Sequence, residues 1–207
     1  MIQGNLKMSF NKEKYLVIRS LIDPKVSEFV FNYFLMKRQV ADTMFKAKYI
    51  SPFNAEWGVW TDHQAPNTYS HYGDIAMETL LLLAQPRLEK EIKKKLVPTY
   101  AYARIYKKGD ILEKHTDRFS CEVSSSIFLG GEEWPIYMGG NKINLKPGDG
   151  AIYKGSEIEH WREPFKGNDC AQVFLHYNST KTKGSKTNMF DTRKHLGLPS
   201  FFKNKTY

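Results

Sequence analysis

Three side chains in the second half of the sequence have the types and spacing to hold one metal ion: His115, Asp117 and His160. In an extended strand, residues i and i+2 point to the same face, so the side chains of His115 and Asp117 can converge while Thr116 points away. His160 stands 43 residues beyond Asp117, at the end of another expected strand. Two imidazoles and one carboxylate on one side of a metal leave other coordination positions open for reactants. The pattern therefore predicts a catalytic metal site.

The donor set favours iron over zinc. Two histidines and one carboxylate are the ligands with which non-haem Fe(II) oxygenases hold a co-substrate and dioxygen on the same ion. Zinc prefers a tetrahedral shell, with a single open position when the site is catalytic. Taken alone, a His-x-Asp pair also fits a hydrogen-bonded pair on the surface of a strand. Its place at a strand end, with a third ligand on a later strand, favours the metal interpretation.

The segment that must position these ligands has the alternating pattern of β-strands. After Pro98, apolar residues recur at every second position in short runs separated by Gly, Pro, Asn and Asp. The runs cover residues 99–106, 111–117, 122–129, 133–138, 142–145, 150–154, 157–161 and 171–177. No helical pattern separates them, so we expect an antiparallel sandwich or jelly roll. The predicted fold class is mainly β with α, with a jelly-roll core at residues 99–178.

Residues 1–98 are expected to form helices and loops that support this core. Asp23 and Pro24 are typical of a helix start, and an apolar stripe at helical spacing follows them. A second helical pattern begins at Asp74, and Pro86 is expected to divide it into two helices. The N-terminal half is therefore predicted to be a helical buttress with loops on the substrate side.

Most of the excess positive charge lies near the C-terminus. The chain has a formal net charge of +9 at pH 7, and residues 179–207 hold seven Lys or Arg against one Asp. Charge runs are usually solvated, and aromatic residues do not alternate with these at the spacing of a base-stacking platform. We therefore predict one domain over residues 1–178 and a basic C-terminal tail. Within the tail, residues 180–187 are expected to be mobile and residues 189–202 to fold back.

The composition indicates an intracellular protein without a membrane segment. The longest apolar run, around residues 80–84, is far shorter than the roughly 20 residues that a bilayer crossing needs. The first residues lack the apolar core of a signal peptide. Cys121 and Cys170 are too few for a disulfide framework or a four-thiolate metal site, so we interpret them as reduced thiols. We expect a soluble, cytoplasmic protein with no membrane partner.

Three stretches of the second half resemble one enzyme family. They are IYKKGDILEKHTDRFSCEVSSSIFL (residues 105–129), INLKPGDGAIYKGSEIEHWREP (143–164) and AQVFLHY (171–177). They are similar to the double-stranded β-helix core of the Fe(II)/2-oxoglutarate-dependent dioxygenases, in particular the prolyl 4-hydroxylase-like branch. In that family a tyrosine at the place of Tyr106 helps to bind 2-oxoglutarate, and a Pro-Gly-Asp turn like residues 147–149 precedes the strand with the second histidine. The resemblance implies Fe(II) as the metal, with 2-oxoglutarate and O2 as co-substrates.

The resemblance also implies a cation for the distal carboxylate of 2-oxoglutarate, and here the sequence departs from the family. Members usually carry a Lys or Arg on the final strand, where residues 169–172 hold none. A buried carboxylate without a partner costs several kcal/mol, so another cation is expected. Arg162 is the first candidate, because alternation places it on the side of His160 and a guanidinium binds a carboxylate bidentately. Arg104 and Lys154 are the alternatives, and an exposed Arg162 in a turn is the competing interpretation.

Two strands carry polar faces suited to the wall of a pocket. In residues 99–106, alternation places Arg104 and Tyr106 on one face together with two more tyrosines. In residues 171–177, Gln172 and His176 share a face. We expect these four side chains, with Arg162, to line the site that binds 2-oxoglutarate.

The implied reaction is hydroxylation of a C–H bond in a peptidyl (prolyl-like) or amino-acid substrate, with release of succinate and CO2. One alternative is oxidative demethylation or modification of nucleic acid by the same chemistry, which the basic tail allows but does not favour. The other is a non-catalytic jelly-roll binding module, in which the His-x-Asp pair is accidental or structural. A peptide, a protein or a small molecule is the expected partner.

Overall fold

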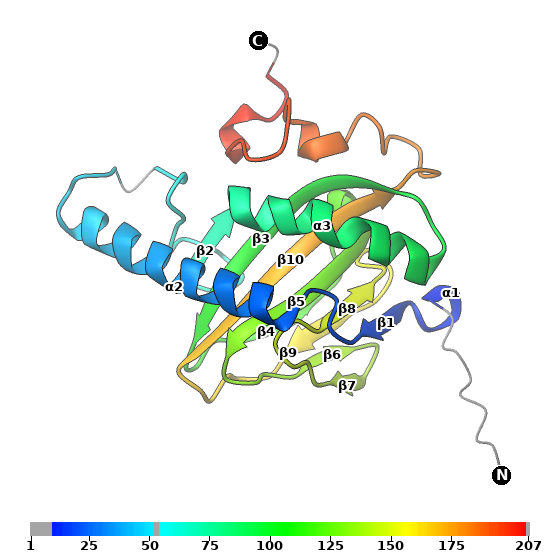
Figure 1. Cartoon of the computed structure of the whole chain (residues 1–207), viewed down its shortest axis with the longest axis horizontal. Helices are drawn as coiled ribbons and strands as arrows, with labels where there is room; N and C mark the ends of the chain where they lie inside the picture. Colours follow the sequence, from blue (N-terminus) through cyan, green and yellow to red (C-terminus); the bar gives the residue numbers. More distant parts are fainter. Residues whose placement is uncertain (1–9, 52–53, 206–207) are drawn as a thin grey trace.

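The chain folds into two antiparallel β-sheets, as the computed structural model of residues 10–51 and 54–205 shows (Figure 1). The six-stranded sheet has the order β1 (Tyr15–Ile18), β8 (Gly150–Tyr153), β5 (Val123–Gly131), β10 (Asp169–Ser179), β3 (Leu96–Lys107) and β2 (Tyr69–Tyr72). The four-stranded sheet has the order β4 (Leu112–His115), β9 (His160–Arg162), β6 (Ile136–Met138) and β7 (Asn141–Ile143). Each predicted run overlaps one strand, so the jelly-roll core is confirmed. The N-terminal part is not only a helical buttress, because β1 and β2 extend the larger sheet.

The space between the two sheets is filled largely by aromatic side chains. Tyr106, Phe128, Trp134, Tyr153 and Phe174 belong to one buried cluster, to which strands of the larger sheet and loops beside the smaller one contribute. Interdigitating side chains of this kind hold two facing sheets together. The residues that the sequence predicts to form a pocket project into this same interior.

Strand β3 takes part in two different cores. Ala101, Ala103 and Ile105 belong to the cluster beneath the helices. Tyr106 and the half-buried Tyr102 belong to the cluster between the sheets. Because successive residues of a strand point to opposite faces, the small and aliphatic residues meet the helices and the larger polar ones meet the sheet interior. The two faces of β3 are those that its alternation predicted.

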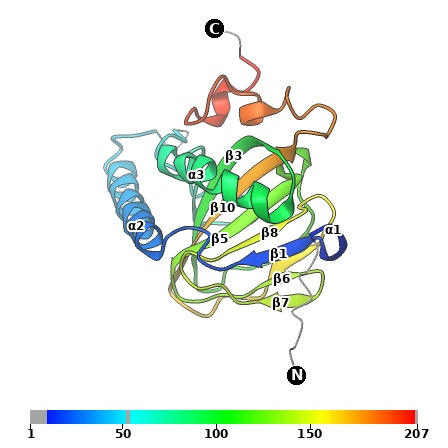
Figure 2. The ribbon, with the colours of Figure 1, turned by 45° about the vertical axis from the view of Figure 1, so that its right-hand side comes forward.

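Two long helices cover the outer face of the six-stranded sheet (Figure 2). Helix α2 (Pro24–Lys46) packs on β5, and α3 (Ile75–Ile92) packs on β3 and β10; a short helix, α1 (Phe10–Glu13), precedes β1. The Asp23 carboxylate caps α2 by accepting a hydrogen bond of 2.8 Å from the backbone N–H of Lys25. Both long helices begin where the sequence predicted.

The expectation that Pro86 divides the second helical pattern is wrong, because α3 runs through it without a break. A proline inside a helix removes the hydrogen bond to the carbonyl four residues earlier, here that of Leu82. Leu82 is 52% exposed, so water can reach this turn. Leu81, Ala84 and Leu88 are buried against the sheet on the opposite side. Packing on the sheet therefore outweighs the local cost of the proline.

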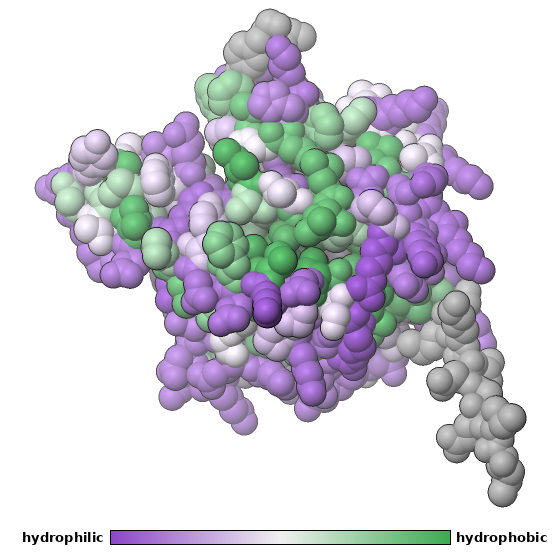
Figure 3. Space-filling view, viewed as in Figure 1, coloured by the Kyte–Doolittle hydropathy of each residue, from purple (hydrophilic) through white to green (hydrophobic). Residues whose placement is uncertain are grey.

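The outward sides of the two long helices carry apolar side chains. Phe29 and Met36 on α2, and Ile75, Leu82 and Leu83 on α3, are each more than half exposed. Figure 3 shows apolar residues gathered over these helices. Within residues 10–51 and 54–205, no helix is long and apolar enough to cross a membrane. Both helices therefore carry apolar residues on two sides, one packed against the sheet and one exposed to solvent.

The C-terminal segment, as far as residue 205, packs on the domain. It contains two short turns, η2 (Met189–Thr192) and η3 (Ser200–Phe202), and η2 contacts β3. The Arg193 side chain is fully buried and donates hydrogen bonds to Glu78 Oε1 at 2.6 Å and to the Thr99 carbonyl at 3.2 Å. This buried ion pair fixes the expected fold-back of the segment to α3 and β3.

Replacing Arg193 with alanine should leave the Glu78 carboxylate buried without a cation. Removing one partner of a buried ion pair costs about 3–5 kcal/mol of folding free energy. We expect the free energy of unfolding, measured in urea, to fall by an amount of that order. The exposed neighbour Lys194 provides the control, and Lys194→Ala should leave the urea midpoint unchanged. Equal losses in the two variants would contradict the role given to the ion pair.

Candidate metal centre

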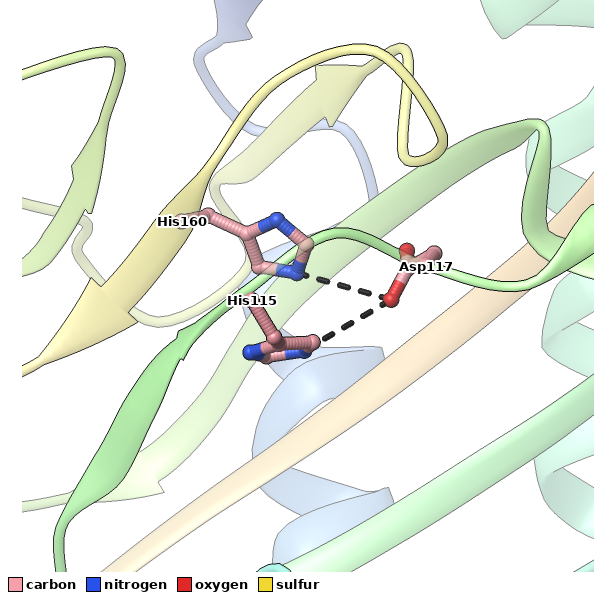
Figure 4. Close-up of side chains that lie close together, drawn as sticks. All are labelled: His115, Asp117 and His160. Carbon is pink, nitrogen blue, oxygen red and sulfur yellow. Dashed lines mark ion pairs between the residues drawn. The ribbon is translucent and has the colours of Figure 1, made fainter.

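Strand pairing brings the three predicted ligands together. His115 ends β4, His160 begins β9, and the two residues are direct partners in the antiparallel register. Asp117 lies two residues beyond β4, with its Oδ1 3.6 Å from the Nε2 of each histidine (Figure 4). One donor atom from each residue lies within 4.8 Å of the other two. The sequence prediction of a His/Asp/His group is therefore matched by the geometry.

Backbone hydrogen bonds orient both imidazoles. The Nδ1–H of His115 donates to the Glu113 carbonyl at 2.8 Å, and that of His160 donates to the Ile158 carbonyl at 3.1 Å. A carbonyl oxygen can only accept, so each Nδ1 carries a proton, and in the neutral form of each ring the lone pair is on Nε2. Both lone pairs are on the side of Asp117. Neutral imidazoles held in this tautomer are the form that binds a metal ion.

The Asp117 carboxylate sits in a closely fitted pocket. Its Oδ2 accepts a hydrogen bond of 3.0 Å from the Ser124 hydroxyl, and its backbone N–H donates to the Gly155 carbonyl at 2.8 Å. The Ser124 oxygen in turn lies 2.8 Å from His176 Nδ1. A Cβ atom on Gly155 would stand 2.3 Å from Asp117 Oδ2 and 2.2 Å from the Cys121 carbonyl, so only glycine fits there. These contacts leave Oδ1 as the oxygen that faces the histidines.

The electrostatics keep these ligands in their metal-binding forms. Burial and the neighbouring His160 imidazole lower the pKa of His115. Burial alone would raise the pKa of Asp117, but its contact with His160 and the nearby His176 outweigh that effect and hold the pKa below its usual value. At neutral pH the group therefore has one ionised carboxylate and uncharged His115. These protonation states and the inward-facing Nε2 atoms fit a divalent ion with oxygen and nitrogen ligands.

A cavity of about 610 Å³ opens above the three ligands. Its aromatic wall includes Tyr72, Tyr100, Tyr102 and Phe174. Its lining also includes Lys203 from the C-terminal segment. A volume of this size admits a co-substrate together with part of a substrate.

The residues that the sequence predicts to bind 2-oxoglutarate lie at two depths relative to the cavity surface. Arg104 and His176 line the cavity, whereas Tyr106 and Gln172 are buried beneath it. Arg104 is already neutralised, because its Nε donates to Asp62 Oδ2 at 2.6 Å. Its Nη1 donates to the Tyr106 hydroxyl at 3.0 Å, which links the two levels.

Arg162 is buried among uncharged groups, so the interpretation of it as an exposed turn residue is wrong. Its exposed fraction is 1%. Its guanidinium donates to the Trp134 carbonyl and lies 3.5 Å from the Ser126 hydroxyl, while its Nε has no hydrogen-bond partner among the described residues. Burial lowers its pKa, and the groups that favour its charge are two tyrosines and Cys170 rather than a carboxylate. Lys154 instead pairs with Glu157, 3.2 Å away.

Sequence reasoning missed several residues of the site. Ser124 belongs to a run of three serines in an otherwise apolar strand, and this polar run was a visible signal of a buried polar function. Asp62, which neutralises Arg104, lies in a loop without a periodic pattern. Lys203 reaches the cavity only because the C-terminal segment folds back, where it pairs with Asp191 at 2.6 Å. No local pattern identifies these two positions.

The fold matches solved structures, although neither a scan against protein-family models nor a search of curated proteins finds a match for this sequence. A Pseudomonas putida prolyl-4-hydroxylase is 12% identical with a TM-score of 0.57, over 82% of this chain and 94% of that one. HygX from Streptomyces hygroscopicus, with nickel and 2-oxoglutarate bound, is 13% identical with a TM-score of 0.56, over 87% and 88%. AviO1 from Streptomyces viridochromogenes is 12% identical with a TM-score of 0.63, over 89% and 98%. The chain thus has the prolyl 4-hydroxylase-like fold that its sequence resembled.

The Ser124 hydroxyl should matter for metal affinity, because it holds the Asp117 carboxylate in place. Loss of such an orienting hydrogen bond typically weakens metal binding about 10–100-fold. We expect a loss in that range for Ser124→Ala in anaerobic Fe(II) titrations. Ser125→Ala is the matched control, because the Ser125 hydroxyl is buried on the same strand with no hydrogen-bond partner in the described residues. An equal loss in the control would show that the effect comes from strand packing.

Proposed function

We propose that this protein is a non-haem Fe(II)/2-oxoglutarate-dependent dioxygenase. The observation that carries the proposal is the His115/Asp117/His160 group, which lies at the base of an open cavity in a prolyl 4-hydroxylase-like fold. Fe(II) with bound 2-oxoglutarate would supply the activation of dioxygen for hydroxylation of a C–H bond, with release of succinate and CO2. The chain itself holds the ion on one side, shields it within the sheets and leaves the cavity side free for reactants.

Arg162 is the proposed partner of the distal carboxylate of 2-oxoglutarate. A buried cation without a carboxylate partner is costly, so an anionic ligand that reaches it gains both charge compensation and hydrogen bonds. Arg162 lies two residues beyond His160 on β9, and its Nε is a buried donor without a hydrogen-bond partner among the described residues. Arg104 is less suitable because Asp62 already neutralises it. Tyr106 and Gln172, buried in the same interior, are proposed to line this deeper part of the site.

The proposed substrate is a peptidyl residue, prolyl-like in the first instance, or an amino acid. The cavity is open to solvent above the metal ligands and carries several tyrosine rings, which suit a side chain inserted from a larger molecule. Nucleic acid is less favoured, because Arg193 and Lys203 of the basic segment are engaged with acidic groups of the domain itself. Turnover assays with prolyl peptides and with free amino acids would separate the two preferred substrate classes.

The first test is anaerobic addition of Fe(II) and then 2-oxoglutarate to the purified protein. A keto acid chelated to Fe(II) gives a visible charge-transfer absorption band, and we expect this band in the wild type. His160→Ala should abolish the band while the circular dichroism spectrum stays unchanged. His195→Ala, a change at an exposed histidine, should keep it. A wild type without the band would support the non-catalytic binding module instead.

Replacing Arg162 with methionine should separate ligand binding from folding. Loss of one partner of a buried charge pair costs about 2 kcal/mol or more, which is a thirtyfold or larger rise in the Kd for 2-oxoglutarate. The ligand-free variant should be no less stable than the wild type, because an uncompensated buried cation is removed. Lys154→Ala should leave the Kd unchanged. An unchanged Kd in Arg162→Met, with a raised Kd in Arg104→Met, would move the carboxylate partner to Arg104.

A further inference from the structure

A second group of metal-binding side chains lies beside the first and shares one residue with it. Asp117, Cys121 and His176 each offer one donor atom within 4.8 Å of the other two. Cys121 and His176 are buried, and both line the cavity above Asp117. His176 comes from β10 of the larger sheet, whereas Cys121 ends the turn η1 (Phe119–Cys121) before β5. The proposed dioxygenase reaction uses neither the thiol nor this imidazole as a ligand.

The charges of the two groups differ by one unit when a divalent ion is bound. Asp117 and a Cys121 thiolate together cancel the charge of such an ion, whereas the group with His115 and His160 contains a single carboxylate. A buried site without net charge avoids the large cost of desolvating a charged centre. In the iron group, 2-oxoglutarate would supply the missing negative charge. Without that ligand, charge balance favours the group that contains the cysteine.

The surroundings of Cys121 select the kind of ion. Its Sγ is buried and lies 3.1 Å from the Tyr100 hydroxyl. A cysteine binds a metal ion as its thiolate, and thiolate sulfur forms its strongest bonds with soft or borderline ions such as Zn²⁺, which displace the thiol proton. The His176 imidazole is buried, and its Nδ1 is held 2.8 Å from the Ser124 oxygen. The nearby cation Arg118 is engaged by Asp191 at 2.9 Å, which limits its repulsion of the ion.

We propose that Asp117, Cys121 and His176 form a second metal site, selective for a thiophilic divalent ion such as Zn²⁺, that competes with the iron site for Asp117. The cavity leaves room for water as a fourth ligand. An ion at this site takes up the negative charge of Asp117 and repels a second divalent ion beside His115 and His160. Zinc binding and Fe(II) binding should therefore oppose each other, and 2-oxoglutarate should shift the balance toward Fe(II).

The test is X-ray absorption spectroscopy at the zinc edge on the full chain with one equivalent of Zn²⁺ and no 2-oxoglutarate. We expect a sulfur scatterer at about 2.3 Å beside nitrogen or oxygen at about 2.0–2.1 Å. Cys121→Ser should convert this shell to nitrogen and oxygen alone. Cys170→Ser is the matched control and should keep the sulfur, because Cys170 is equally buried but belongs to neither group.

A wild-type shell without sulfur, or a sulfur signal that survives Cys121→Ser, would overturn the proposal. The wild-type spectrum decides even if the serine variant does not fold. The measurement contains neither Fe(II) nor 2-oxoglutarate, so its outcome does not depend on the dioxygenase activity. Loss of the keto acid band with an intact zinc–sulfur shell would reject the proposed function and leave the second metal site standing.

Discussion

The pairing of β4 with β9 is the constraint on which the site depends. Metal ligands must stand within a few ångströms of one another, and two histidines 45 residues apart reach that distance only if their strands meet in one register. The direct pairing of His115 with His160 provides this, and the turn after β4 returns Asp117 to the same place. A shift by one residue would turn a histidine to the opposite face of its strand. The rest of the jelly roll fixes this short pairing, which is too small to persist alone.

Charge compensation distinguishes Arg162 from the other buried arginines of the structure. Arg104 with Asp62 and Arg193 with Glu78 are buried cations whose carboxylates lie within 2.6 Å. Arg162 is equally buried and has no carboxylate partner within the part of the chain that the structure describes. Buried charges are normally paired, so a buried arginine without a carboxylate partner indicates a place where an anionic ligand would be stabilised. It lies on the same short strand as His160, which agrees with its proposed role as the partner of the distal carboxylate of 2-oxoglutarate.

Local periodicity predicted most of the fold and the core of the site. The i, i+2 spacing of His115 and Asp117 is a property of one strand, and the strand runs after Pro98 show the same short-range alternation. The pairing of strands and the exposure of a single side chain depend on residues far apart in the sequence. The sequence therefore allowed two interpretations of Arg162, as a buried partner of a carboxylate or as an exposed turn residue. The continuity of α3 through Pro86 and the contact of Lys203 with the cavity likewise depend on packing that no window of residues contains.

The two-sided character of β3 restricts how this protein can change during evolution. Its small residues face the helices and its polar residues face the cavity, with both sets on one strand. Insertion or deletion of a single residue would turn Arg104 toward the helices and Ile105 toward the cavity. Such a change would lower the stability of the fold and disrupt the lining of the cavity at the same time. A change by two residues preserves the facing of both sets. Insertions and deletions that persist within β3 should therefore involve an even number of residues. The loops around the cavity can gain or lose any number of residues, because their side chains do not alternate between two faces.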